Sequence, residues 1–185
     1  DLAGNAGGTG QTANFTIDTS APSVGLVSST TANGYYNSGD VINILVYFTE
    51  SVTITGTPQL TLETGSSDAT ATYSSGSGSQ SIIFSYTVAN GNTSSDLDYT
   101  STTALALNGG TMNDSAGNAA SLTLPSPSAS GSLSANQAIV IDTAAPSIGA
   151  VATSALSWGA YLNATEDNSD GTVTVTTSGV EDGQT

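Results

Sequence analysis

Val41–Glu50, with the sequence VINILVYFTE, decides the fold class of this chain. Apolar side chains stand at every second position, a period of two that predicts a β-strand buried on one face. The positions expected to face inward are Ile42, Ile44, Val46 and Phe48. A strand with one buried face needs neighbours to cover it, so the stretch predicts a sheet around it.

Similar stretches lie on both sides of this strand. Ser81–Val88 repeats the alternation, and its expected inward positions are Ile82, Phe84, Tyr86 and Val88. Weaker strands are predicted at Ala13–Thr19 (with Phe15 and Ile17 inward), Ser23–Ser28, Gln59–Thr64, Ala69–Ser74, Leu122–Leu124 and Gln137–Thr143. Gly, Asn and Pro separate the strands, and no window has helical periodicity. About seven short strands per unit predict an all-β fold, an immunoglobulin-like β-sandwich.

Two short motifs occur twice. Ile17–Pro22 (IDTSAP) recurs as Ile141–Pro146 (IDTAAP), and Asp1–Asn5 (DLAGN) recurs as Asp114–Asn118 (DSAGN). The same order with a different spacing predicts sandwiches repeated in tandem, with an insertion in one loop. The expected units are a final strand and linker of a preceding repeat in 1–20, a complete repeat in 21–143 and the beginning of another in 144–185. Because the chain starts at Asp1, we expect a window of a longer array.

The composition excludes several classes of function. Among 185 residues there are 15 Asp and Glu but no Lys, Arg or His, which gives a formal net charge of −15. Without basic residues the chain cannot bind nucleic acid or an anionic membrane through a basic patch. No imidazole or amine can activate a Ser or Thr nucleophile, so we expect no enzyme. Cysteine is absent, and no apolar stretch approaches the ~20 residues of a membrane-spanning helix.

Carboxylates without cationic partners favour a bound metal ion. Ca²⁺ takes about six to eight oxygen ligands, which the loops at the two ends of a sandwich can supply. Strand alternation predicts one set at the end where the chain enters the unit: Asp18, Glu50, Asp114 and Asn118. It predicts a second set at the opposite end: Asp40, Asp96, Asp98 and Asp142. Asp96 and Asp98 would point the same way in an extended segment. The alternative is that these residues only form turns.

Several segments together resemble a known family. In chain order they are Tyr36–Asp40, Phe48–Glu50, Gly76–Ser79, Asp96–Asp98, Asp114–Asn118 and Ile141–Pro146. Their order resembles the bacterial immunoglobulin-like repeats of giant calcium-dependent surface adhesins, and Gly179–Thr185 is similar to a neighbouring repeat type. The resemblance implies a secreted, non-enzymatic module at the bacterial cell surface that extends a long fibre and is often stiffened by Ca²⁺ at its joints. Its partners would be neighbouring repeats of the same chain.

Two other functions stay open at this point. The chain could be a subunit of an extracellular filament or sheath, in which another copy supplies the strands that the incomplete third unit lacks. It could also be a carbohydrate-binding module that stacks sugars on Trp158 and Tyr161, although such residues more often anchor a core or a joint. Glu166–Gly171 resembles an EF-hand loop but fails the pattern, since Thr177 stands where the bidentate Glu belongs.

Overall fold

The computed structural model describes residues 16–148 and 177–178, and an eight-stranded antiparallel sheet is its main element. The strands follow the order β1-β3-β6-β5-β4-β8, while β10 joins β3 and β9 joins β4. The sheet curls around its own apolar face. Its strands are β1 (Val24–Ser29), β3 (Val41–Thr55), β4 (Gln59–Glu63), β5 (Ala69–Ser75), β6 (Ser79–Thr87), β8 (Asp98–Tyr99), β9 (Leu105–Ala106) and β10 (Thr111–Asn113).

A small second sheet contains the last strand of the unit. In this sheet β11 (Ile139–Asp142) runs parallel to β2 (Gly34–Tyr36) and antiparallel to β7 (Thr93–Ser94). One helical turn, α1 (Leu133–Asn136), precedes β11. Beyond the linker, β12 (Ser147–Ile148) pairs with β13 (Thr177–Ser178). The prediction of an all-β fold is confirmed.

The core lies on the inner face of the curled sheet. The inward positions predicted for β3 and β6, together with Val88, are all buried, as are Leu60 and Leu62 of β4. Leu97, Tyr99, Leu133 and Ile141 belong to the same buried cluster. Burying one large apolar side chain contributes roughly 1.5–3 kcal/mol, so this shared core holds the sheet in its curled form.

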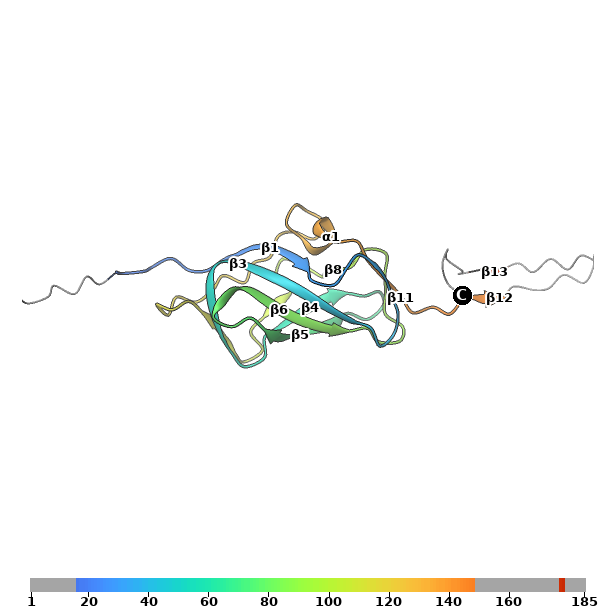
Figure 1. Cartoon of the computed structure of the whole chain (residues 1–185), viewed down its shortest axis with the longest axis horizontal. Helices are drawn as coiled ribbons and strands as arrows, with labels where there is room; N and C mark the ends of the chain where they lie inside the picture. The colour runs from blue at the N-terminus through green and yellow to red at the C-terminus, as the bar shows by residue number, and fades with distance from the viewer. Residues whose placement is uncertain (1–15, 149–176, 179–185) are drawn as a thin grey trace, which may run out of the picture.

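The two linkers leave the unit at opposite ends. Figure 1 shows residues 16–22 in blue at one end and the segment after β11 in orange at the other. The strands of the main sheet run along the line between these ends. An array of such units would therefore extend in one direction. The predicted unit boundaries themselves stay a prediction.

Three predictions about local structure are wrong. Residues 16–20 form no strand, and Ile17 is 76 % exposed, because no described strand pairs with this segment. Leu122 to Leu124 form no strand either, although Ser121 just before them makes an isolated bridge to Ser23. The helical turn α1 was not expected, since four residues are too few for a periodic pattern.

Strand β3 is longer than predicted and irregular where the prediction ended. It continues past Glu50 to Thr55, and its register against β6 shifts between Tyr47 and Val52. Beyond the shift, β10 pairs with the last three residues of β3. A bulge lets a strand change the direction of its side chains, and Glu50 lies within this one.

Two glycines in the turn between β5 and β6 give a matched test of the backbone. Gly76 and Gly78 both have positive φ, 107° and 84°. A Cβ at Gly76 would collide with the carbonyl of Ser81, whereas nothing lies within 4 Å of one at Gly78. We expect Gly78→Ala to cost about 1 kcal/mol and Gly76→Ala about 3 kcal/mol in urea unfolding. Equal losses would contradict the described turn.

Candidate metal centre

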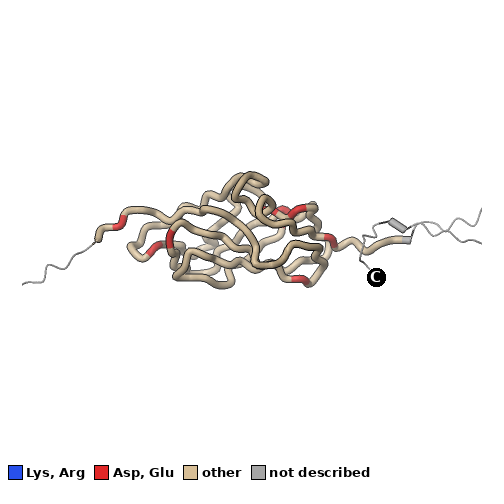
Figure 2. The backbone as a smooth tube through the Cα atoms, turned by 45° about the horizontal axis from the view of Figure 1, so that its top comes forward, with Lys and Arg blue, Asp and Glu red and all other residues tan. Residues whose placement is uncertain are grey.

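Three carboxylates from distant parts of the sequence meet at the N-terminal end of the unit. Asp18 comes from the linker, Glu50 from β3 and Asp114 from the turn after β10. One carboxylate oxygen of each lies within 4.8 Å of the others. Figure 2 shows that the Asp and Glu residues of the described chain, in red, lie toward the two ends of the unit. The predicted grouping at this end is therefore present in the structure.

The turn at Asp114–Asn118 is closed by its own side chains. The Oδ1 atom of Asp114 accepts hydrogen bonds from the backbone N–H groups of Ala116 (2.9 Å) and Asn118 (2.8 Å). The amide of Asn118 donates to the Oδ2 atom of Asp114 at 2.8 Å. These bonds fix the Asp114 carboxylate in position before any ligand arrives.

Asn118 also holds the linker. Its amide donates to the backbone carbonyl of Asp18 at 3.2 Å, and the Oδ1 atom of Asp18 accepts from the N–H of Ser20 at 3.0 Å. Asn118 was predicted as a metal ligand; in the structure its amide instead makes a direct contact between the linker and the unit. Glu50 differs from its neighbours, because its half-buried carboxylate accepts no hydrogen bond from the described residues.

The chemistry of this group fits a hard cation. Its ligand atoms are carboxylate oxygens of Asp18, Glu50 and Asp114, the hard oxygen ligands that Ca²⁺ prefers. The Asn118 side chain presents its NH2 group to Asp114 and to the Asp18 carbonyl, so that group orients the site and is not a ligand. Each of the three carboxylates keeps lone pairs beyond the hydrogen bonds it accepts, although the Oδ1 atom of Asp114 already accepts two. No Lys, Arg or His exists in the chain to offset three negative charges. A bound Ca²⁺ would be held by Asp18, Glu50 and Asp114 and would supply that missing positive charge.

The pKa of Asp114 provides a test of the turn. Burial raises the pKa of this carboxyl, but hydrogen bonds from Asn118, Ala116 and Gly117 outweigh that effect and hold the pKa below its ordinary value. The stability it contributes is present above the unfolded-state pKa and is lost as the pH falls through the lowered folded-state pKa.

Replacing Asn118 should move that pKa. Asn118→Ala removes the side-chain donor, so we expect the pKa of Asp114 to rise toward its unfolded-state value. The stability lost on acidification should then be smaller, and its loss should be complete at a higher pH. An NMR titration of the side-chain carboxyl carbons would measure the shift. The distant variant Asn37→Ala should leave the Asp114 titration unchanged, and an unchanged titration in Asn118→Ala would contradict the described turn.

At the C-terminal end the four predicted residues do not come together. Within residues 16–148, Asp40, Asp96, Asp98 and Asp142 form no group of three carboxylates within metal-binding reach. Asp40 accepts from the N–H of Asn37 (2.8 Å), and Asp142 accepts from the N–H of Ala144 (2.9 Å). Both therefore close local turns, which was the alternative interpretation.

Asp98 is turned into the protein. It is 7 % exposed, and its carboxylate accepts from the N–H of Tyr99, the N–H of Ser128 and the hydroxyl of Ser134. Asp96 is exposed in the bend before β8. Burial and then the charge of Asp98 raise the pKa of Asp96. The two carboxylates therefore do not face one shared site, because the chain bends between β7 and β8.

Known proteins offer no guide to this site. Comparison with family models, with curated proteins and with solved structures gives no match. The function proposed below therefore depends on the residues and geometry of this chain. In the described part of the chain no helix has the length and hydropathy to cross a membrane. Trp158, Tyr161 and Glu166–Gly171 lie outside the described residues.

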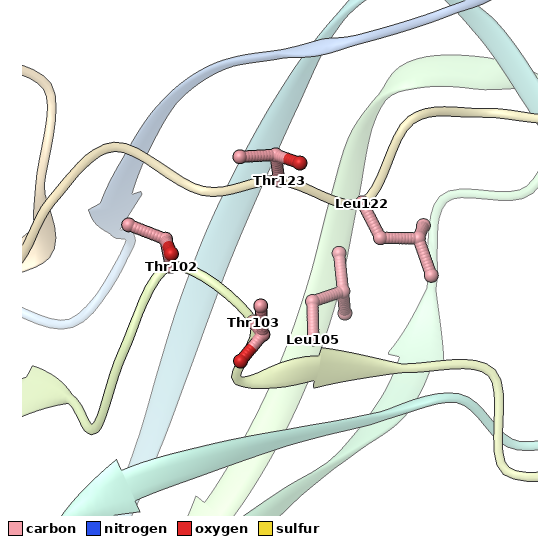
Figure 3. A pocket seen from close by; sticks show the side chains of 5 residues that line it. All are labelled: Thr102, Thr103, Leu105, Leu122 and Thr123. Atoms are coloured by element: carbon pink, nitrogen blue, oxygen red, sulfur yellow. The ribbon is translucent and has the colours of Figure 1, made fainter.

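A shallow hollow lies beside β9. Its volume is about 140 Å³, and the side chains that line it come from Thr102, Thr103, Leu105, Leu122 and Thr123 (Figure 3). The lining offers hydroxyl and aliphatic groups and contains no titratable side chain. Ligand pockets usually measure about 300–1,000 Å³, so this hollow is too small to be a typical binding site.

Proposed function

We propose that the chain is a structural link in a long extracellular fibre or adhesin at a bacterial cell surface. Each link would be an immunoglobulin-like sandwich, and Ca²⁺ would stiffen the joint where the linker meets the next unit. The main support for the proposal is that the Asp18 carboxylate, from the linker, lies close to the carboxylates of Glu50 and Asp114, from the unit.

The arrangement of the strands supports a tandem array. The Ile-Asp-Thr motif stands before the unit and again at its end, and the two linkers leave at opposite ends (Figure 1). The linker at 17–22 leads into β1, and its second copy at 141–146 leads into β12. The curled sheet and the sheet of β2, β11 and β7 would be the two faces of the sandwich.

Charge explains why a cation would stiffen this joint. Three carboxylates within 4.8 Å repel one another, and without a cation this repulsion would weaken the contact between the linker and the unit. A bound Ca²⁺ would replace this repulsion with ligand bonds from both parts. The hydrogen bond from Asn118 to Asp18 already orients the linker, so little reordering would be needed.

The stiffening can be measured with spin labels. The chain has no cysteine, so Thr16→Cys on the linker and Thr53→Cys on β3 give a unique label pair. We expect the distance distribution between the labels to be narrow with Ca²⁺ and broad with a chelator. Distributions of equal width in the two conditions would contradict the proposal.

A further inference from the structure

The chain contains three Asn–Gly pairs: Asn33–Gly34, Asn90–Gly91 and Asn108–Gly109. This pair of residues favours deamidation, because glycine has no side chain to obstruct attack by its backbone nitrogen on the preceding side-chain amide. The nitrogen loses its proton and bonds to Cγ of the Asn, and the side-chain nitrogen leaves as ammonia. Water then opens the cyclic imide, which leaves aspartate or isoaspartate. The rate at each pair depends on how the fold holds the two reacting groups.

At two of the pairs the side-chain amide is held by a hydrogen bond. Oδ1 of Asn33 accepts from the N–H of Ala138, and the N–H of Gly34 donates to the carbonyl of the same residue, both at 3.0 Å. The amide of Asn108 donates to the carbonyl of Thr57 at 3.1 Å, and the backbone of Asn108 has a φ of 47°. Closing the imide ring at either pair requires these contacts to break.

The side chain of Asn90 is held by no such contact. It is exposed, and it makes no hydrogen bond with the described residues. The pair lies in the turn between β6 and β7, which is closed by the N–H of Asn92 donating to the carbonyl of Ala89 at 3.0 Å. Nothing lies within 4 Å of the place where a Cβ of Gly91 would stand. The amide of Asn90 can therefore turn toward the nitrogen of Gly91 without displacing a neighbour.

One contact opposes the reaction at this turn, and it comes from the linker after β11. The N–H of Gly91 donates to Oγ1 of Thr143 at 3.0 Å, and that hydroxyl donates to the carbonyl of Asn92, also at 3.0 Å. A hydrogen bond to the neutral form of a group disfavours its ionised form. The bond to Thr143 therefore disfavours loss of the proton that the attacking nitrogen must give up.

We propose that Asn90 is a site of spontaneous deamidation and that Thr143 of the linker slows the reaction. The product is a new carboxylate in a chain that has no basic residue to pair with it. In isoaspartate the backbone is also one carbon longer, which shifts the N–H of Gly91 relative to Thr143. Deamidation would thus weaken the contact between this turn and the linker. The inference needs neither Ca²⁺ nor a fibre, so it is independent of the proposed function.

The three pairs can be compared within one sample of the whole chain. A protease that cuts after aromatic residues separates them into the peptides 16–35, 87–99 and 100–158. After incubation at mildly alkaline pH, tandem mass spectrometry measures the fraction of each Asn that has become a carboxylate. Dividing each rate by that of the chain unfolded in urea removes the effect of neighbouring residues.

The ratio of native to unfolded rates tests the proposal. We expect this ratio to be severalfold higher at Asn90 than at Asn33 and Asn108. Equal ratios at the three positions, or a higher ratio at either of the other two, would overturn the assignment of Asn90.

Two variants at one position test the contact with the linker. Thr143→Val removes the hydroxyl that accepts from Gly91, so we expect deamidation of Asn90 to become severalfold faster. Thr143→Ser keeps a hydroxyl and should keep the natural rate. The rates at Asn33 and Asn108 in the same samples report general loosening of the fold and should stay unchanged. Equal rates at Asn90 in the two variants, or an equal rise at all three positions, would overturn the role of Thr143.

Discussion

The variant Asp98→Ala is expected to lose about 3 kcal/mol of unfolding free energy, because three donors lose the buried carboxylate that accepts their hydrogen bonds. These donors are the N–H groups of Tyr99 and Ser128 and the hydroxyl of Ser134. Through them Asp98 connects β8 to the turn at 128 and to α1. Urea unfolding at neutral pH would measure the loss.

The matched variant Asp98→Asn keeps the shape of the side chain and one acceptor oxygen. We expect it to lose about 1 kcal/mol, because only part of the hydrogen bonding is lost. Both variants should retain whatever Ca²⁺ response the natural chain has, since the carboxylate is directed at protein donors. Loss of the Ca²⁺ response in Asp98→Asn would contradict this assignment and would support the sequence-based prediction that Asp98 is a metal ligand.

The variant Glu50→Gln is expected to remove the stabilisation by Ca²⁺ without destabilising the metal-free protein. Glu50 accepts no hydrogen bond from the described residues, so its charge has no structural partner to lose. Near Asp18 and Asp114 that charge is repulsive until a cation binds. At a free Ca²⁺ concentration 100 times the Kd, binding stabilises the folded state by about 2.7 kcal/mol. Glu50→Gln should abolish most of this stabilisation.

Glu63→Gln is the control for Glu50→Gln. Glu63 is an exposed carboxylate at the end of β4, and the variant removes the same charge from a position outside the candidate metal centre. Chemical unfolding with Ca²⁺ and with a chelator gives the gain for each variant. An undiminished gain in Glu50→Gln, or an equal loss in both variants, would contradict the assignment of Glu50.

Much of this fold could be predicted from the sequence because its main strands alternate strictly. In β3 and β6 the period of two places every predicted inward residue in the core. The end of β3 could not be predicted, since the continuation to Thr55 depends on pairing with β10. The strand predicted at Ala13–Thr19 is absent over residues 16–19. Alternating side chains form a strand only where another strand pairs with them, and no strand of the described chain pairs with this segment.

The candidate site was predictable at one end and not at the other. Strand direction was enough to place Glu50 and Asp114 near Asp18, because the end of a strand fixes which end of the unit a residue occupies. The metal site predicted at the other end, from Asp40, Asp96, Asp98 and Asp142, is not formed. The direction of these side chains depends on chain bends and hydrogen-bond partners that cannot be read from the sequence. Asp98 turns inward to meet Ser128 and Ser134, and no spacing rule connects these positions.

A thermal melt of the 185-residue chain with Ca²⁺ and with excess chelator tests the central claim most directly. A ligand that binds only the folded state raises the midpoint, and saturating Ca²⁺ should raise it by about 10 °C for a domain of this size. Mg²⁺ at the same concentration is the control for general screening of the −15 charge. The proposal predicts a large shift with Ca²⁺ and a small one with Mg²⁺. The same midpoint with Ca²⁺ and with chelator would contradict it and leave Asp18, Glu50 and Asp114 as carboxylates that bind no Ca²⁺.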